Sequence, residues 1–424
     1  DQGVYLPQLP ALIEASTGTD ELVEVGFEAV ISLMIGSDHK EEEVTEWTSI
    51  VDAYQRFLAV EPIEEKWDRD CRHAAADLLR LMIGHSRSTF KAADHVDLLA
   101  EGVLAFTDDP DPESVLPSED QLHTIQTTES LHSRVAGVRT RGTSGLIWLL
   151  MTIKEHSLNR ETLVDSLRKR LIDLFTDDAM TVRFVLGRHL LTLYGYDSEV
   201  VEDHFDQLLP TGNDPESRVH FVSTWSGYVT HSNVYESMFD QLTSKYQHAV
   251  SIHRTDDFEQ YDQSLRSLCT HIAVAYAWGF VDVDDDLVQE LLQIEAGDTV
   301  AEDPNESSSS ATVHMANAFN SVLSSNEDSN GHHERWERII GFWEHRMEAI
   351  TSPTDAGDEL RAYVEILRHA PREQSLIEIK PLLWEAAPGI RHSFSTHTLL
   401  EYLEQKTTEN RHDPLAASKA AVEV

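Results

Sequence analysis

The sequence predicts an all-α fold, an α-solenoid or α-α superhelix built from antiparallel helix pairs. Apolar residues recur at helical spacing along most of the chain, as in 65–85, where Cys71, Ala74, Leu78 and Met82 form one stripe. No segment alternates apolar and polar residues convincingly, as a half-buried strand does. Short polar turns separate many of the helical segments, and such turns favour antiparallel helix neighbours.

The apolar stripes place helices in order along the chain. We expect helices at 20–36, 43–59, 65–85, 93–106, 134–156, 160–175, 179–195, 216–229, 234–251, 258–279, 332–350, 356–369 and 394–406. The chain has two cysteines, Cys71 and Cys269, which by themselves are too few for a disulfide framework or a zinc site. Both fall in predicted helices, so we expect them to be small buried apolar residues.

Polar, proline-rich and serine-rich stretches divide the chain into segments. The stretch TDDPDPESVLPSED combines three prolines with six acids, and EAGDTVAEDPNESSSSAT is of low complexity. We therefore expect an N-terminal helical segment at 1–106, an acidic Pro-rich linker at 107–120, a second helical segment at 121–294, a low-complexity acidic and Ser-rich insertion with a short helix at 295–331, and a C-terminal helical segment with a flexible tail at 332–424.

The charge balance indicates a habitat. Of 424 residues, 75 are acidic and 33 basic, which gives a formal net charge of −42, and Lys is much scarcer than Arg. In molar salt the Debye length falls to about 3 Å and the self-repulsion is screened. The composition resembles that of cytoplasmic proteins of salt-in haloarchaea, so we expect high salt to be needed for stability. The same charge argues against direct nucleic-acid binding, which needs a cationic surface.

The ends and the apolar runs of the chain bear on its context. No apolar run reaches the eighteen residues of a membrane span, so we expect no membrane partner. The chain opens with DQGVYLPQLP, without a signal-peptide pattern or an initiator Met. We therefore expect a cytoplasmic chain that is a piece of a longer protein.

The stretch TDDAMTVRFVLGRHLLTLYG, residues 176–195, shows how one predicted repeat is built. Acids precede an apolar helix, where a carboxylate can accept hydrogen bonds from the free N–H groups of the first turn. The expected buried stripe is Val182, Val185, Leu186, His189, Leu190 and Leu193. Arg183 lies beside this stripe, so its stem can pack there while its guanidinium reaches an acid next door. The stretches 214–229 and, less closely, 68–82 share this layout, which resembles the second helix of HEAT-like repeats.

A search for motifs that carry chemistry predicts no catalytic residue, no cofactor-binding residue and no metal ligand. The chain lacks GxxxxGK[ST], GxGxxG and GxSxG, and its histidines are not clustered in the sequence. The acidic stretch 282–286 imitates the start of a calcium loop, but an acidic helix start explains it better. Glu378 and Lys380 form an ExK element, so a metal-dependent nuclease-like enzyme is one alternative function.

Residues 120–406 resemble the helical C-terminal region of large prokaryotic multidomain NTPases of the STAND class, several of them antiviral defence proteins. The resemblance is carried by Val138, Arg139 and Gly142 in SRVAGVRTRGTSGLIWLLM, by DDAMTVRFVLGRHLLTLYG, and by WSGYVTHSNVYESMFDQLTSKYQHAV. In the first of these stretches, Thr140 and Arg141 separate the Val-Arg pair from the glycine, which departs from the pattern. The resemblance implies that NTPase and effector domains lie upstream and that this region recognises a partner.

We therefore expect a non-catalytic scaffold or sensor region that binds a protein partner or the upstream domains of its own polypeptide. The predicted partner-binding residues are Arg183, Arg188, Trp225, Tyr228 and Tyr235. A purely structural helical spacer is the other alternative.

Overall fold

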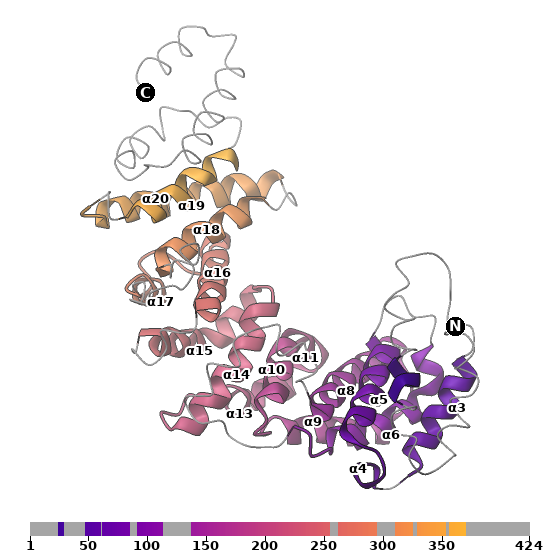
Figure 1. The fold of residues 1–424 in the computed structure, drawn as a ribbon. Coiled ribbons are helices and arrows are strands. Elements are labelled where there is room, and N and C mark those ends of the chain that lie inside the picture. Colours follow the sequence, from indigo (N-terminus) through magenta and orange to yellow (C-terminus); the bar gives the residue numbers. More distant parts are fainter. Residues whose placement is uncertain are drawn as a thin grey trace. The chain divides into compact units, whose positions relative to one another are not determined.

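The described parts of the chain are helical (Figure 1). The chain divides into two compact units, Asp1–Ser232 and Asn233–Val424. The computed structural model describes residues 24–28, 47–60, 62–84, 91–112, 137–254, 262–294, 310–324, 329–352 and 356–369. Every regular element within these ranges is an α-helix or a short 3-10 helix, which confirms the all-α fold. None of the described helices combines the length and the apolar character of a membrane span.

The first unit contains eleven labelled α-helices and one 3-10 helix within its described residues. They are α3 (Trp47–Leu58), α4 (Ile63–Lys66), α5 (Arg69–Gly84), η3 (Ala92–His95), α6 (Val96–Thr107), α8 (Val138–Glu155), α9 (Glu161–Leu174), α10 (Met180–Arg188), α11 (Leu190–Tyr196), α12 (Ser198–Asp203), α13 (Phe205–Leu208) and α14 (Pro215–His231).

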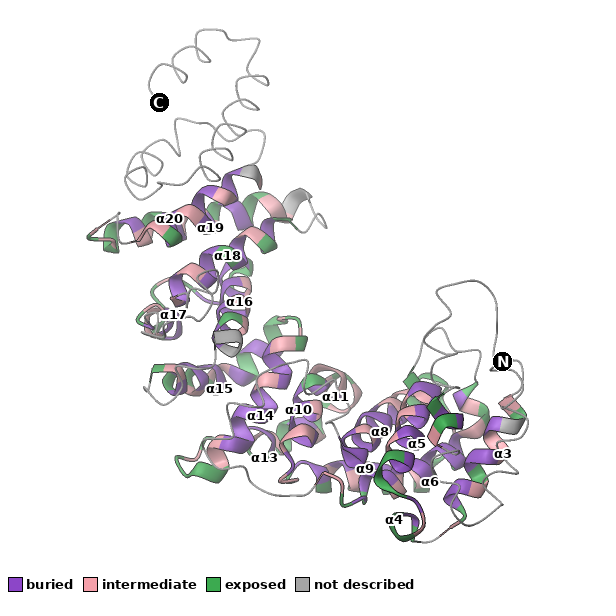
Figure 2. Ribbon diagram, viewed as in Figure 1, coloured by how far each residue is buried: buried purple, intermediate pink, exposed green. Residues whose placement is uncertain are grey.

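Helices α5, α8, α10 and α14 form a row in which each helix contacts the next, and α6 and α9 pack beside α8. Buried residues line the sides on which these helices meet (Figure 2). Each helix in the row therefore buries its apolar stripe against the next helix, as a stack of helical repeats requires.

Helices α10 and α14 cross at two glycines. A Cβ atom added to Gly187 would meet the backbone carbonyl of Thr224 and lie 2.7 Å from its carbon atom. A Cβ atom added to Gly227 would meet the carbonyl of Phe184 and lie 2.8 Å from the amide nitrogen of Arg188. Because both contacts are with backbone, only glycine at these positions lets the helices approach so closely.

The second unit repeats the same principle with six α-helices and one 3-10 helix within its described residues. They are α15 (Glu236–Arg254), α16 (Asp262–Trp278), α17 (Asp286–Leu291), α18 (Ala311–Ser324), α19 (Ser329–Ala349), α20 (Gly357–Ile366) and η6 (Leu367–His369). Helix α16 contacts α15, α18 and α19, and α18 in turn contacts α20. Stacked rings of Trp343 and Tyr363, with centroids 5.4 Å apart, bring α19 and α20 together in the core.

Several sequence predictions are confirmed by these elements. Cys71 and Cys269 are buried free thiols. The stripe predicted around Arg183 is largely correct, with Val182, Leu186 and His189 buried and Val185 half-buried. At residues 282–286 the acidic helix start is observed, because Asp285 caps α17 by accepting a hydrogen bond from the amide of Leu287.

Other boundaries differ from the predictions. The helix expected at 179–195 is two helices, α10 and α11, which meet at His189, where φ is −99° and ψ is 10°. Of the expected linker at 107–120, the structure describes residues 107–112, and Asp109 among them is buried. The boundary between the two units falls after Ser232, inside the segment expected at 121–294. Helix α18 lies within the insertion expected at 295–331, where its buried face fixes it against α16 and α20.

Candidate functional site

A ladder of acidic and basic side chains links successive helices of the row in the first unit. In its first step, Arg72 of α5 donates two hydrogen bonds to the carboxylate of Asp109, at 2.8 and 3.3 Å. Both side chains are almost fully buried. Two parallel N–H···O bonds satisfy the pair without water, which a buried charge requires.

The second step of the ladder connects α8 with the turn that precedes α10. Arg139 donates to the carbonyl oxygen of Asp109 at 2.7 Å, and its Nε lies 2.9 Å from Oδ2 of Asp177. An arginine at the start of α8 thus reaches an acid in the turn before α10, a contact that the sequence analysis expected of Arg183 and not of Arg139.

Arg183 of α10 occupies the equivalent place one repeat later. It donates to the carbonyl oxygens of Asp177 and Gln207, at 2.7 and 3.1 Å. Burial lowers its pKa to about 10, and the carboxylates of Asp177, Asp178 and Glu216 oppose that effect. The guanidinium is therefore still charged near pH 7.

At the next helix, α14, a histidine replaces the arginine. The sequences VRFV at 182–185 and VHFV at 219–222 align, so His220 stands 37 positions after Arg183, and the capping acid Asp214 stands 37 positions after Asp177. Asp214 accepts a hydrogen bond from the amide of Ser217 at 2.9 Å and so caps α14.

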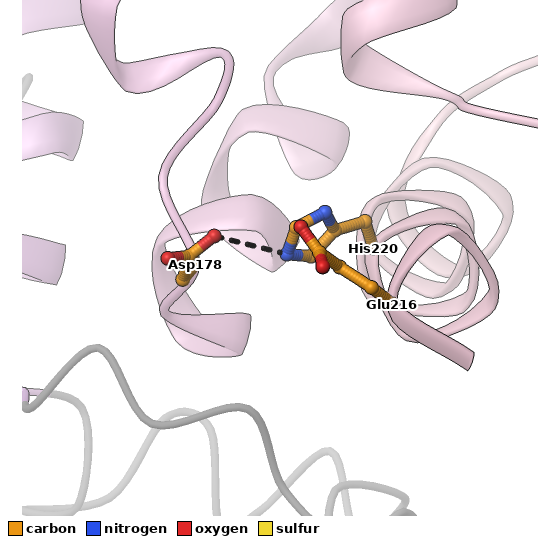
Figure 3. Close-up of side chains that lie close together, drawn as sticks. All are labelled: Asp178, Glu216 and His220. Carbon is orange, nitrogen blue, oxygen red and sulfur yellow. Dashed lines mark ion pairs between the residues drawn. The ribbon is translucent and has the colours of Figure 1, made fainter. Parts of the chain in front are cut away.

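The exchange of arginine for histidine creates a cluster of three side chains, Asp178, Glu216 and His220 (Figure 3). Asp178 lies in the turn between α9 and α10, and Glu216 and His220 lie one helical turn apart on α14. Their ligand-type atoms are all within 4.8 Å of one another. Figure 3 shows the imidazole facing the carboxylate of Asp178, with Nε2 3.4 Å from Oδ1.

The imidazole of His220 is neutral near pH 7. Its pKa is lowered to about 4, first by burial and then by the nearby guanidinium of Arg183, against the opposite effect of neighbouring carboxylates. His220 is 6% exposed, while Asp178 is half-buried and Glu216 is exposed. The cluster therefore has one fixed inner group and two outer groups that solvent can reach.

The five predicted partner-binding residues do not share one environment. Arg183, Trp225 and Tyr228 are buried in the first unit, so their side chains cannot contact a partner in this structure. The expectation that these three line an open binding surface is not supported. Arg188 is exposed, and Tyr235, in the second unit, is 55% exposed. A partner-binding role for these two residues stays a prediction.

The second unit presents an exposed aromatic side chain that the sequence analysis did not select, Trp278, at the end of α16. Its side chain is 56% exposed, and the guanidinium of Arg335 lies over the ring, 4.6 Å from the centroid. Two backbone hydrogen bonds close the helix end: Phe280 N donates to Ala275 O at 2.8 Å, and Gly279, with φ of 83°, donates to Tyr276 O.

The nuclease alternative depends on two residues that the structure does not describe. Glu378 and Lys380 lie outside the described residues. Comparison of the chain with protein-family models, curated proteins and solved structures returned no match.

Proposed function

We propose that this chain is a non-catalytic helical-repeat scaffold or sensor region that binds a protein partner, with Trp278 as the centre of the binding surface. The observation that carries the proposal is a large aromatic side chain exposed at a hydrogen-bonded helix end. Trp278 is one of three large apolar residues exposed within the described ranges, with Val25 and Tyr235. Trp, Tyr and Arg dominate the binding energy of protein interfaces.

The surroundings of Trp278 support its role as an anchor. Arg335 under the ring is only 5% exposed, so the cation–π contact fixes one face of the indole and leaves the other to solvent. Arg338, also on α19, donates to the carbonyl oxygens of Tyr276 and Val281 at 2.8 and 2.9 Å. An anchor that is already ordered loses little conformational entropy on binding.

The wider context of the proposal is a larger, NTPase-containing haloarchaeal protein of the defence type. The resemblance of the α8 and α10 sequences to helical regions of such proteins supports it, as does the net charge of −42. In that context the partner is a separate protein or the upstream part of the same polypeptide.

The test is a comparison of partner capture by matched variants. The tagged chain, held in molar KCl, captures proteins from a lysate of its source organism, and a stoichiometric candidate is then purified and titrated against the chain. We expect Trp278→Ala to weaken that affinity by about tenfold or more, which corresponds to about 1.4 kcal/mol. Val25→Ala, an exposed apolar truncation in the other unit, is the control and leaves the affinity unchanged.

Two results would overturn the proposal. A purified partner that binds wild type and Trp278→Ala equally well shows that the indole is not the anchor. Absence of any stoichiometric partner favours the structural spacer.

A further inference from the structure

We propose that Asp178, Glu216 and His220 bind a divalent transition-metal ion of the Zn²⁺ class. The inference is independent of the partner-binding proposal, because it concerns the first unit and rests on different side chains.

The first argument is an unsatisfied buried nitrogen. The Nε2 atom of His220 is buried and makes no hydrogen bond to any described residue. Its 3.4 Å contact with Oδ1 of Asp178, dashed in Figure 3, would be an ion pair only if the imidazole were protonated. A buried polar atom without a partner costs about 1–3 kcal/mol. A cation between the imidazole and the carboxylates would satisfy all three groups together.

The second argument is the set of donor atoms. One imidazole nitrogen and two carboxylate oxygens suit Zn²⁺ and its first-row neighbours, whereas Ca²⁺ and Mg²⁺ favour oxygen ligands alone. Metal–ligand distances of about 2.1 Å in a tetrahedral site place ligand atoms roughly 3.4 Å apart. Since all the ligand atoms already lie within 4.8 Å, the exposed Glu216 has to move most, and its side chain is free to rotate at the surface. Three protein ligands leave a fourth position for water.

The third argument is the local charge. The carboxylates that act electrostatically on His220 and Arg183 exceed the basic groups beside them, which are chiefly the guanidiniums of Arg183 and Arg139. The carboxylates are Asp177, Asp178, Asp214 and Glu216. A local excess of carboxylates favours a divalent cation despite the repulsion from Arg183.

The position in the ladder shows what the ion does. At the preceding step, the Arg139 guanidinium joins α8 to the turn before α10. At the Asp178 cluster, the ion would join that same turn to α14, so it replaces a guanidinium as the cation between two successive repeats. Such an ion ties folding of the first unit to metal binding.

The test uses Zn²⁺ alone as the probe. The full chain is stripped with chelator, dialysed into KCl and titrated with ZnCl₂ by isothermal calorimetry, with the thermal unfolding midpoint as a second readout. We expect one site in wild type that raises the midpoint. Glu216→Gln and Asp178→Asn change accessible side chains and should each weaken that site by about tenfold or more. His220→Gln should do the same where it folds.

The control is Glu161→Gln, which removes an exposed acid from the first turn of α9, the same kind of position that Glu216 holds on α14. This variant should bind Zn²⁺ as wild type does. The proposal is overturned if wild type binds no Zn²⁺, if Glu216→Gln and Glu161→Gln bind it equally, or if Mg²⁺ binds the cluster as tightly as Zn²⁺.

Discussion

The crossing of α10 and α14 depends on the absence of a side chain at Gly187. In a Gly187→Ala variant, the new methyl group would lie 2.7 Å from the carbonyl carbon of Thr224 and 3.1 Å from its Cα. Unstrained carbon pairs lie about 3.5–4.0 Å apart. The nearest atom of all is the carbonyl oxygen of Thr224, which lies closer than either carbon. These atoms belong to the backbone of a helix and cannot rotate away, so α10 and α14 must separate by more than about 1 Å at their crossing.

The cost of this separation has two terms of opposite sign. Overpacking in a well-packed interior costs about 1–3 kcal/mol, and more when backbone has to move, so the upper end applies. Replacing a helical glycine by alanine returns about 1 kcal/mol of helix propensity. The net expectation is a loss of about 2 kcal/mol or more in the free energy of unfolding of the first unit.

Urea unfolding followed by circular dichroism measures this loss, with free energies from linear extrapolation. Gly195→Ala is the matched control, because Gly195 lies in the neighbouring helix α11 and a Cβ atom there meets nothing within 4 Å. The control should be neutral or up to about 1 kcal/mol more stable than wild type. A Gly187→Ala protein that unfolds within about 0.5 kcal/mol of wild type would refute the close crossing.

The remaining predictions concern charges. Glu359→Gln should destabilise the second unit by about 3 kcal/mol, because it leaves Arg346 without the buried carboxylate that accepts its hydrogen bonds at 2.7 and 3.1 Å. The control is Arg361→Ala, which removes a more exposed ion pair with Asp358. It should cost under about 1 kcal/mol in the same urea assay. The pKa of His189 is lowered to about 4 by burial and nearby cations, so the unfolded chain binds the extra proton first as the pH falls. The stability that the neutral imidazole contributes is complete above about pH 6.5 and falls by up to about 3 kcal/mol towards pH 4. His189→Gln should therefore flatten that part of the curve of unfolding free energy against pH. Equal slopes in the variant and in wild type would contradict the assignment. The net charge of −42 predicts that the thermal unfolding midpoint rises between 0.1 and 2 M KCl, because the Debye length falls from about 10 Å to below about 3 Å and screens the repulsion between carboxylates. A neutral osmolyte at the same concentration should give a smaller rise.

The sequence was a sound guide to the helices and to their buried faces. Helical periodicity depends on residues three and four positions apart, so the local sequence is enough to predict it. The predicted stripe that includes Val182, Leu186 and His189 is accordingly buried. The break between α10 and α11 was missed, since nothing in the local pattern marks His189 as a helix end. Its ring packs edge-on against that of Trp148 on α8, with the ring centroids 5.4 Å apart, and this contact joins positions distant in the sequence.

Contacts between distant parts of the chain also explain why the partner-binding residues and the Asp178, Glu216 and His220 cluster could not be predicted from the sequence. Trp225 and Tyr228 were selected as aromatic binding residues, but both are buried, and the ring of Trp225 packs against the rings of Phe221 and Tyr228. Glu216 and His220 stand four positions apart on one helix face, a spacing that a search for carboxylate–histidine pairs would find. Asp178 completes the cluster from 38 positions before Glu216, and no sequence spacing indicates that approach.

By itself, the sequence determined that this protein is all-α, strongly acidic and built of short helices whose apolar stripes must be covered by other helices. Only the tertiary structure decided which ionisable side chains meet. The placement of Arg139 against Asp177, of His220 against Asp178, and of Trp278 over Arg335 follows from how one helix lies on another. The physical reason is that burial depends on local periodicity, whereas electrostatic contacts depend on distances across the fold.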